Sequence, residues 1–509
     1  MSADRTTGVP DQAYPSGPGL RPHHLTPTDP PAGFVGRDHA AFLRATGPDY
    51  FGWLHHVTAA AGCSHPIRLA GEVATVDKAT GQLLAMVATA DLPDGEIYKP
   101  CGNRRHAVCP SCAHTYQRDA YQLVRAGLVG GKGIPPTVAA HPAVFVTLTA
   151  PSFGPVHTRR TNQHGNPIPC RPRRQAVHCP HDLPTACHRI HAEDDPALGV
   201  PLCLDCYDHH AQVVWNTTAP ELWRRTTIAL NRHLRARART LGIAWMEQAT
   251  ASGKVRRVPP IKLSFGKVAE MQRRGVVHYH AIVRLDGIDP TDPTAVIPPP
   301  DGFDVDDLAA AVTHAVTTVG FTTAPHPIQA AGWRIGWGEQ VDTRPVNADG
   351  DITDGKVAGY LAKYATKSTE TTGHVSRRLD NDTIDLYADH QGTHPERLID
   401  ACWTLGAHRD WQRLRRWTHM LGFGGHFLTK SRRYSVTFRL LRDARVIWRR
   451  TETGHEQAHQ PEETTVIVGL LSYAGSGWRT TGDALLANTA AALARERRQI
   501  AREETLAAA

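Results

Sequence analysis

Three patterns are missing from this chain of 509 residues, and each absence excludes a class of protein. No apolar run approaches the roughly 20 residues of a transmembrane helix. The N-terminus has no charged start followed by an apolar core, so no secretory signal is expected. No Gly-x-x-x-x-Gly-Lys-Ser/Thr pattern is present, which argues against a P-loop ATPase. We therefore expect a cytoplasmic protein that has no membrane partner and no nucleotide-driven motor of its own.

The net charge is modestly positive, +8 from 57 Lys/Arg and 49 Asp/Glu. This excess permits nucleic-acid binding but does not require it. Residues 409–450 hold twelve Lys/Arg against two Asp, a local charge of +10 that exceeds that of the whole chain. Basic groups can follow a phosphate backbone, while aromatic rings stack on unpaired bases or pack beneath the basic surface. The aromatic residues interleaved with these cations are Trp411, Trp417, Phe423, Phe427, Tyr434, Phe438 and Trp448.

A repeated Tyr-x-x-Lys unit spans residues 360–367. On a helix, Tyr360 and Tyr364 share a face, and Lys363 and Lys367 lie beside them. A phenol is a poor nucleophile near neutral pH, because its unperturbed pKa is about 10. Two phenols presented together, each with a cation close by, indicate attack on an anion such as a phosphodiester. Taken alone, residues 360–367 are more typical of an amphipathic helix that buries both tyrosines and exposes both lysines.

Residues 275–286 predict a β-strand, since they are rich in β-branched residues and lie between a Gly and an Asp-Gly. His278 and His280 share one face of that strand and form a chelating pair for a divalent cation. Residues 261–270 predict the partner strand, with a turn at 272–275. The hairpin would bring Glu270 to the histidines as a third ligand, provided that the register is right. The alternative to a metal site is that these two histidines simply lie on a half-solvated strand and bind no ion.

In a cytoplasmic protein, the ten cysteines are expected to be thiolates rather than disulfides. Two Cys-x-x-Cys pairs predict two structural, tetrahedral Zn²⁺ sites. Only Cys402 is typical of an ordinary core cysteine. For the first site we predict four thiolates: Cys63, Cys101, Cys109 and Cys112. For the second we favour Cys179, Cys187, Cys203 and Cys206, with Cys170 as the main rival and His181, His188 and His191 also competing.

A further apolar strand at residues 144–151 precedes the histidine strand, and the tyrosine helix comes last. In this order the three elements resemble those of the HUH endonucleases, in particular the replication initiators of rolling-circle plasmids and small single-stranded-DNA phages. More closely, roughly residues 60–450 resemble the RepSA-type initiators of actinobacterial plasmids and integrative elements. The resemblance rests on Cys101-Gly-Asn-Arg-Arg, Cys109-Pro-Ser-Cys112, Thr149-Ala-Pro-Ser-Phe-Gly154, Cys203-Leu-Asp-Cys-Tyr-Asp208 and Lys267-Val-Ala-Glu270.

This resemblance implies an α+β fold, in which an antiparallel-sheet HUH nuclease core with helices carries zinc-binding modules and a basic C-terminal region. It implies a plasmid replication initiator that nicks and joins single-stranded or hairpin origin DNA through a 5′-phosphotyrosine, starting rolling-circle replication. Glu270, His278 and His280 would hold Mg²⁺ or Mn²⁺, and the two lysines of the tandem would stabilise phenolate or phosphate charge. Host helicase and DNA polymerase are the expected partners.

The order of motifs predicts five segments. They are a disordered tail at 1–36, a helical segment with the first zinc site at 37–135, the catalytic domain at 143–375 with a zinc-binding insertion at about 156–210, a basic DNA-binding region at 376–475, and a tail helix at 476–509.

Two other functions use some of the same parts. A zinc-dependent DNA-binding regulator without catalysis would need only the thiolate sites and the basic region. A relaxase for DNA transfer resembles this arrangement, but relaxases generally place the tyrosine ahead of the histidines. Here the histidines come first, which favours an initiator over a relaxase.

Overall fold

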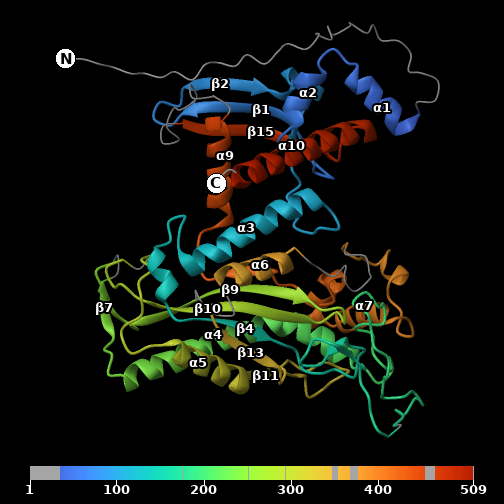
Figure 1. Cartoon of the computed structure of the whole chain (residues 1–509), viewed down its shortest axis with the longest axis vertical. Helices are drawn as coiled ribbons and strands as arrows, with labels where there is room; N and C mark the ends of the chain where they lie inside the picture. Colours follow the sequence, from blue (N-terminus) through green and yellow to red (C-terminus); the bar gives the residue numbers. More distant parts are fainter. Residues whose placement is uncertain are drawn as a thin grey trace. The chain divides into compact units, whose positions relative to one another are not determined.

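The computed structural model describes residues 35–175, 177–249, 252–292, 294–346, 353–366, 377–452 and 465–507. They form two compact units, one made of residues up to 101 together with those from 461, and one of residues 102–460 (Figure 1). We call them the terminal unit and the central unit. Every strand pair among the described residues is antiparallel, as the predicted α+β class requires. Within the described ranges, no helix combines the length and apolar composition needed to cross a bilayer.

The terminal unit joins the two ends of the chain in one sheet of strand order β15-β1-β2, with β3 also paired to β1. Strand β1 pairs with β15 from Ile67–Ser476 to Asp77–Thr465. This grouping differs from the predicted segments, which placed residues 461–475 in the basic region and 476–509 in a separate tail. The elements are α1 (Gly36–Ala45), α2 (Tyr50–Val57), β1 (Ile67–Asp77), β2 (Leu83–Ala88), β3 (Ile97–Lys99), β15 (Thr465–Ser476) and α10 (Thr481–Ala507).

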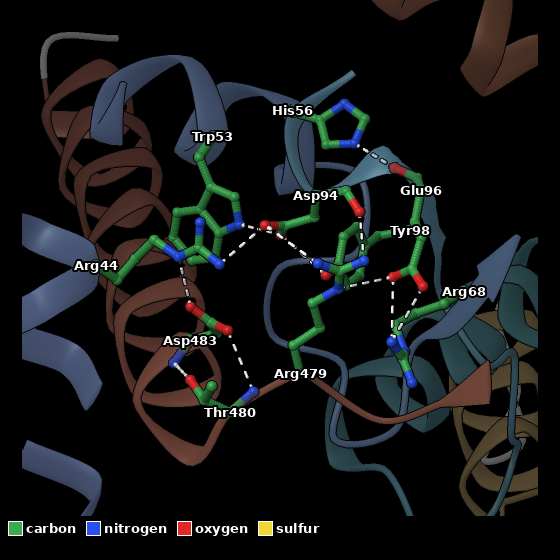
Figure 2. A network of polar contacts seen from close by, with 10 residues as sticks. All are labelled: Arg44, Trp53, His56, Arg68, Asp94, Glu96, Tyr98, Arg479, Thr480 and Asp483. Carbon is green, nitrogen blue, oxygen red and sulfur yellow. Dashed lines mark hydrogen bonds and ion pairs between the residues drawn. The ribbon is translucent and has the colours of Figure 1, made fainter. Parts of the chain in front are cut away.

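A polar network ties the helices of the terminal unit to the loop before β3 (Figure 2). Asp94 accepts hydrogen bonds from Arg44 (2.9 Å), Trp53 (2.9 Å) and Tyr98 (3.0 Å). Arg44 also donates to Asp483 near the start of α10, at 2.7 Å. Burial opposes ionisation of Asp94, but the Arg44 guanidinium and these donors outweigh it and lower the pKa of the carboxyl. The network therefore has a structural task in this unit.

The central unit is built on a five-stranded sheet of order β13-β4-β10-β9-β14. The predicted hairpin and the predicted apolar strand are confirmed as three adjacent members of this sheet. Residues 334–345 contribute two short strands to different sheets, and only the second of them pairs with β4. The strands of the main sheet are β4 (Ala143–Leu148), β9 (Ile261–Met271), β10 (Val277–Gly287), β13 (Val341–Pro345) and β14 (Leu428–Lys430).

Helices cover both faces of this sheet, with α3 and α6 on one side and α4 and α5 on the other (Figure 1). Alternation along β10 produces the two layers: Tyr279 packs against Trp223 of α4, whereas Ile282 shares a core with Leu123 of α3 and Leu361 of α6. The predicted placement of Tyr360 and Tyr364 on one helix is confirmed by α6. The four covering helices are α3 (Pro110–Val129), α4 (His209–Thr240), α5 (Val305–Thr318) and α6 (Asp354–Tyr364).

The central unit contains further strands and α-helices besides this sheet and its four covering helices. They are β5 (Arg160–Thr161), β6 (Pro167–Ile168), β7 (Met246–Ala249), β8 (Val255–Val258), β11 (Gly320–Thr322), β12 (Arg334–Gly336), α7 (His394–Leu405), α8 (Arg413–Arg416) and α9 (Phe438–Glu452).

The aromatic residues of the basic region are mostly core residues. Trp411, Phe423, Phe427 and Tyr434 are at most 7% exposed, so these four pack beneath the surface and are not free to stack on bases. The guanidinium side chains around them reach solvent, and the exposed ones include Arg409, Arg413, Arg416, Arg432, Arg439 and Arg442. The region therefore offers a basic surface over an aromatic core.

One buried cation predicts a pH dependence of stability. Lys267 on β9 is 4% exposed, and its Nζ lies 3.6 Å from the ring centre of Tyr279. Burial lowers the pKa of Lys267 to about 7. An unfolded lysine titrates near 10.4, so between about pH 7 and 10 the unfolded chain binds more protons than the folded one. This destabilising effect is absent above about pH 10.4 and grows as the pH falls toward 7.

We therefore expect Lys267→Met to raise the free energy of unfolding at pH 7 by about 1–4 kcal/mol. The gain should shrink toward pH 10, where folded Lys267 is neutral and the unfolded lysine has begun to lose its proton. Urea denaturation at the two pH values measures this difference. Lys99→Met, at an exposed position on β3, is the control and should change little at either pH. If Lys267→Met raised the free energy of unfolding equally at both pH values, the prediction would be contradicted.

Candidate metal and nucleophile site

The pairing register of the β9–β10 hairpin brings three candidate metal ligands together. His278 is directly opposite Glu270 across the two strands, and His280 lies two residues further along the same face. The Nε2 atoms of the two histidines are 2.6 Å apart, and Oε2 of Glu270 lies 3.3 Å from the first and 3.2 Å from the second. Two imidazole nitrogens and a carboxylate oxygen converging in this way suit a divalent cation.

Neighbouring side chains hold both imidazole rings from their outer edges. Thr147 of β4 pairs with His280, and its Oγ1 lies 3.1 Å from Nδ1 of that ring. The side-chain amide of Gln272 lies 2.9 Å from Nδ1 of His278. Phe145 stacks on His280, with ring planes only 6° apart. Both Nε2 atoms therefore face each other and the carboxylate of Glu270.

Sequence reasoning did not assign Thr147, Gln272 or Phe145 to the site. The only available signal was the alternation of the apolar strand at 144–151, which places Phe145 and Thr147 on one face. Which face that would be, and which residue of β10 would lie opposite, depends on pairing between segments more than 130 residues apart.

The charge state of the three ligands favours cation binding. Burial opposes the charged form of Glu270, but hydrogen bonds from the two histidines outweigh it and lower its pKa to about 2. Burial also lowers the pKa of His280, and this effect outweighs the neighbouring Glu270 carboxylate, which raises it. Near neutral pH the group is a carboxylate beside a neutral imidazole, which leaves lone pairs available to a metal.

Helix α6 holds both tyrosines over this group. The Tyr360 hydroxyl lies 3.2 Å from Nε2 of His280, and the two phenol rings are 4.5 Å apart between centroids. The Tyr364 ring lies 5.7 Å from the His280 ring. Tyr360 is 39% exposed, so the interpretation in which the helix buries both tyrosines does not hold. The opposite face of α6 packs into the core instead, through Val357, Ala358, Leu361 and Ala362.

The phenols are not ionised by their surroundings. Burial raises the pKa of Tyr360, and the neighbouring Tyr364 and Glu270 raise it further. Burial also raises the pKa of Tyr364. Lys363 is exposed on α6, while Lys367 lies outside the described residues. A bound cation would supply positive charge that favours phenolate formation.

The insertion between β4 and α4 contains two clusters of cysteine and histidine. One holds Cys179, Cys203 and Cys206, as predicted, but its fourth member is His181. Cys187 lies in the second cluster, so the ligand set that we predicted is divided between the two. The exposed His188 belongs to neither. The second cluster consists of His157, Cys170, Cys187 and His191.

The first predicted zinc set involves both units. Cys63 and Cys101 belong to the terminal unit, where the Cys101 amide donates to Sγ of Cys63 at 3.3 Å. Cys109 and Cys112 belong to the central unit, at the start of α3. This four-thiolate site stays a prediction. Cys402 is fully buried in the core of the central unit, as predicted.

Comparison with known proteins places these features in context. Residues 49–492 match the family model RepSA, described as "Replication initiator protein, pSAM2". A relative from Streptomyces ambofaciens, named "Replication initiator protein", is 40% identical over 468 residues, covering 90% of this chain and 94% of the relative. Among solved structures, none matches the chain.

Proposed function

This chain belongs to the RepSA family of replication initiator proteins, and from that premise we propose that it nicks and rejoins single-stranded origin DNA in the manner of an HUH endonuclease. The observation that carries the proposal is the 3.2 Å approach of the Tyr360 hydroxyl to Nε2 of His280. This nitrogen also belongs to the group of three candidate metal ligands. A potential nucleophile and a potential Lewis-acid site therefore meet at one point.

Glu270, His278 and His280 are the residues that would hold Mg²⁺ or Mn²⁺. A cation bound there would supply Lewis-acid activation of the scissile phosphate. The mixed nitrogen and oxygen donor set tolerates Mn²⁺ well. Thr147 and Gln272 keep the two rings in place, so that the geometry exists before DNA arrives.

The chain's own part in the reaction is nucleophilic attack. A phenolic oxygen of Tyr360 or Tyr364 bonds to the phosphorus while the bond to the 3′ oxygen breaks. The phenol loses its proton to solvent, and the leaving 3′ oxygen gains one. One phosphodiester is exchanged for another, so no nucleotide hydrolysis is needed. The second phenol then performs the same exchange at the junction formed after one round of synthesis.

The exposed guanidinium groups of residues 409–442 supply the attraction for DNA. Phosphate contacts of this kind give affinity without sequence information, and binding should weaken steeply with salt. The freed 3′ hydroxyl is a primer for host DNA polymerase, and a host helicase would separate the strands. Exposed lysine Lys363, one residue before Tyr364, adds positive charge beside the nucleophiles.

A covalent trapping assay tests the proposal. Purified protein is incubated with labelled single-stranded origin DNA and Mn²⁺, and a denaturing gel measures label retained on the protein. We expect retention that requires the divalent ion, disappears on protease treatment and falls by about 10²-fold or more in His280→Ala. DNA that is bound without any retained label would support a non-catalytic regulator and contradict the nicking mechanism.

A further inference from the structure

The insertion of the central unit contains a second group of four potential metal donors, separate from the cluster that includes the Cys-x-x-Cys pair at 203–206. We propose that His157, Cys170, Cys187 and His191 bind a zinc ion of their own, and that this ion holds the segment against which the β9–β10 turn is fixed. Sequence spacing gave no reason to group these four, because they come from three short loops separated by polar residues.

The distances fit zinc closely. Nδ1 of His157 lies 3.2 Å from Nε2 of His191, and Sγ of Cys187 lies 3.5 Å from the same nitrogen. For Zn–N near 2.05 Å and Zn–S near 2.3 Å, a tetrahedron has edges of about 3.3 Å between nitrogens and about 3.5–3.6 Å between nitrogen and sulfur. The two measured separations match those edges. Cys170, Cys187 and His191 are at most 7% exposed, as expected for a closed structural site.

The surroundings of the donors support ligation. Nδ1 of His191 donates to Oδ2 of Asp195 at 2.7 Å, which leaves Nε2 free to bind a metal. The Thr158 amide donates to Sγ of Cys170 at 3.1 Å, which holds this sulfur in position. Backbone bonds between Arg171 and Cys187 hold the two cysteine loops side by side, with N–O distances of 2.8 and 3.0 Å.

The same segment contacts the turn of the hairpin that carries the candidate catalytic ligands. Arg273 donates to the carbonyl of Glu193 at 2.7 Å and to that of Asp195 at 3.2 Å. A side chain at Gly199 would lie 2.7 Å from the backbone of Arg273. Gln272, the preceding residue, contacts His278. Fixing residues 191–199 therefore fixes the turn from which Gln272 positions that imidazole.

Zinc content of the full-length protein tests the site, with one double variant for each cluster. We expect Cys170→Ser/Cys187→Ser to lose one equivalent by elemental analysis, Cys203→Ser/Cys206→Ser to lose one, and the quadruple variant to lose two. Cys402→Ser, at a buried cysteine outside both clusters, should retain the wild-type content. Full retention by the first variant, or loss of only one equivalent by the quadruple variant, would overturn the proposal of a separate ion.

A milder variant keeps the proposal testable if the cysteine variants do not fold. Asp195→Asn retains all four donors but weakens the support of His191, so its affinity for one zinc should fall by about 10–100-fold in competition with a chelator. Arg189→Ala is the control, because it removes an exposed contact of Asp195 while keeping the hydrogen bond between Asp195 and His191. Equal zinc affinity in Asp195→Asn and wild type would count against ligation by His191.

The inference that residues 191–199 fix the β9–β10 turn rests on the proposed function of Glu270, His278 and His280. Mn²⁺ affinity tests it separately from zinc content. Arg273→Ala should keep the wild-type zinc content while its Mn²⁺ dissociation constant, measured by electron paramagnetic resonance, rises by about tenfold. An unchanged Mn²⁺ dissociation constant would show that contact between residues 191–199 and the β9–β10 turn does not support the candidate metal ligands. Absence of Mn²⁺ binding in the wild type would instead refute the proposed function and leave the zinc result standing.

Discussion

Replacing both Tyr360 and Tyr364 with phenylalanine is expected to reduce covalent labelling by single-stranded origin DNA by about 10³-fold or more, because no phenolic oxygen remains to attack the phosphate. Phenylalanine at position 360 keeps the aromatic ring that packs edge-on against Phe145 and His280. Helix α6 and the His280 imidazole should therefore stay in place. Labelling on a denaturing gel in the presence of Mn²⁺ gives the measurement.

Each single variant separates cutting from joining. Tyr360→Phe and Tyr364→Phe should each retain some labelling through the remaining phenol, yet fail to transfer the bound strand to a second site. Tyr387→Phe, at a half-buried tyrosine packed against a different core cluster from that of α6, is the matched control and should behave as wild type. If the double variant is labelled as well as wild type, another residue is the nucleophile and the assignment of α6 is wrong.

Removing Asp286 from the end of β10 is expected to destabilise the central unit by about 3–5 kcal/mol, because it would leave a guanidinium buried without its partner. Asp286 and Arg284 are both 0% exposed and form two hydrogen bonds, of 2.7 and 2.9 Å. Asp286 also accepts from Ser264 at 2.6 Å and contacts His141 at 2.7 Å. Urea denaturation of Asp286→Ala measures the loss.

An exposed ion pair of the same sheet supplies the control. Arg344 donates to Asp342 at 2.7 Å on β13, with side chains 60% and 49% exposed, so Asp342→Ala should cost less than about 1 kcal/mol. The double variant Arg284→Met/Asp286→Leu should be more stable than either single variant, since it leaves no unpaired charge. A cost for Asp286→Ala as small as that for Asp342→Ala would show that the buried pair contributes little.

The zinc clusters mark the limit of reasoning from spacing. Cysteine pairs three residues apart predict metal binding because a short loop can place two thiolates around one ion. The remaining donors come from distant loops, and spacing could not decide between His181 and Cys187 as partner of Cys203 and Cys206. Backbone pairing of the loops around Cys170 and Cys187 decided it.

The sequence by itself determined the site features that depend on local periodicity. Alternation placed His278 and His280 on one face of a strand, helical spacing placed Tyr360 and Tyr364 together, and a short turn brought Glu270 opposite His278. Only tertiary structure decided that α6 lies over the face of the sheet that carries the histidines. It alone decided which donors share a cluster and that β1 pairs with β15, nearly 400 residues later. Periodicity fixes directions within an element, whereas contacts between distant elements depend on packing that no local pattern records.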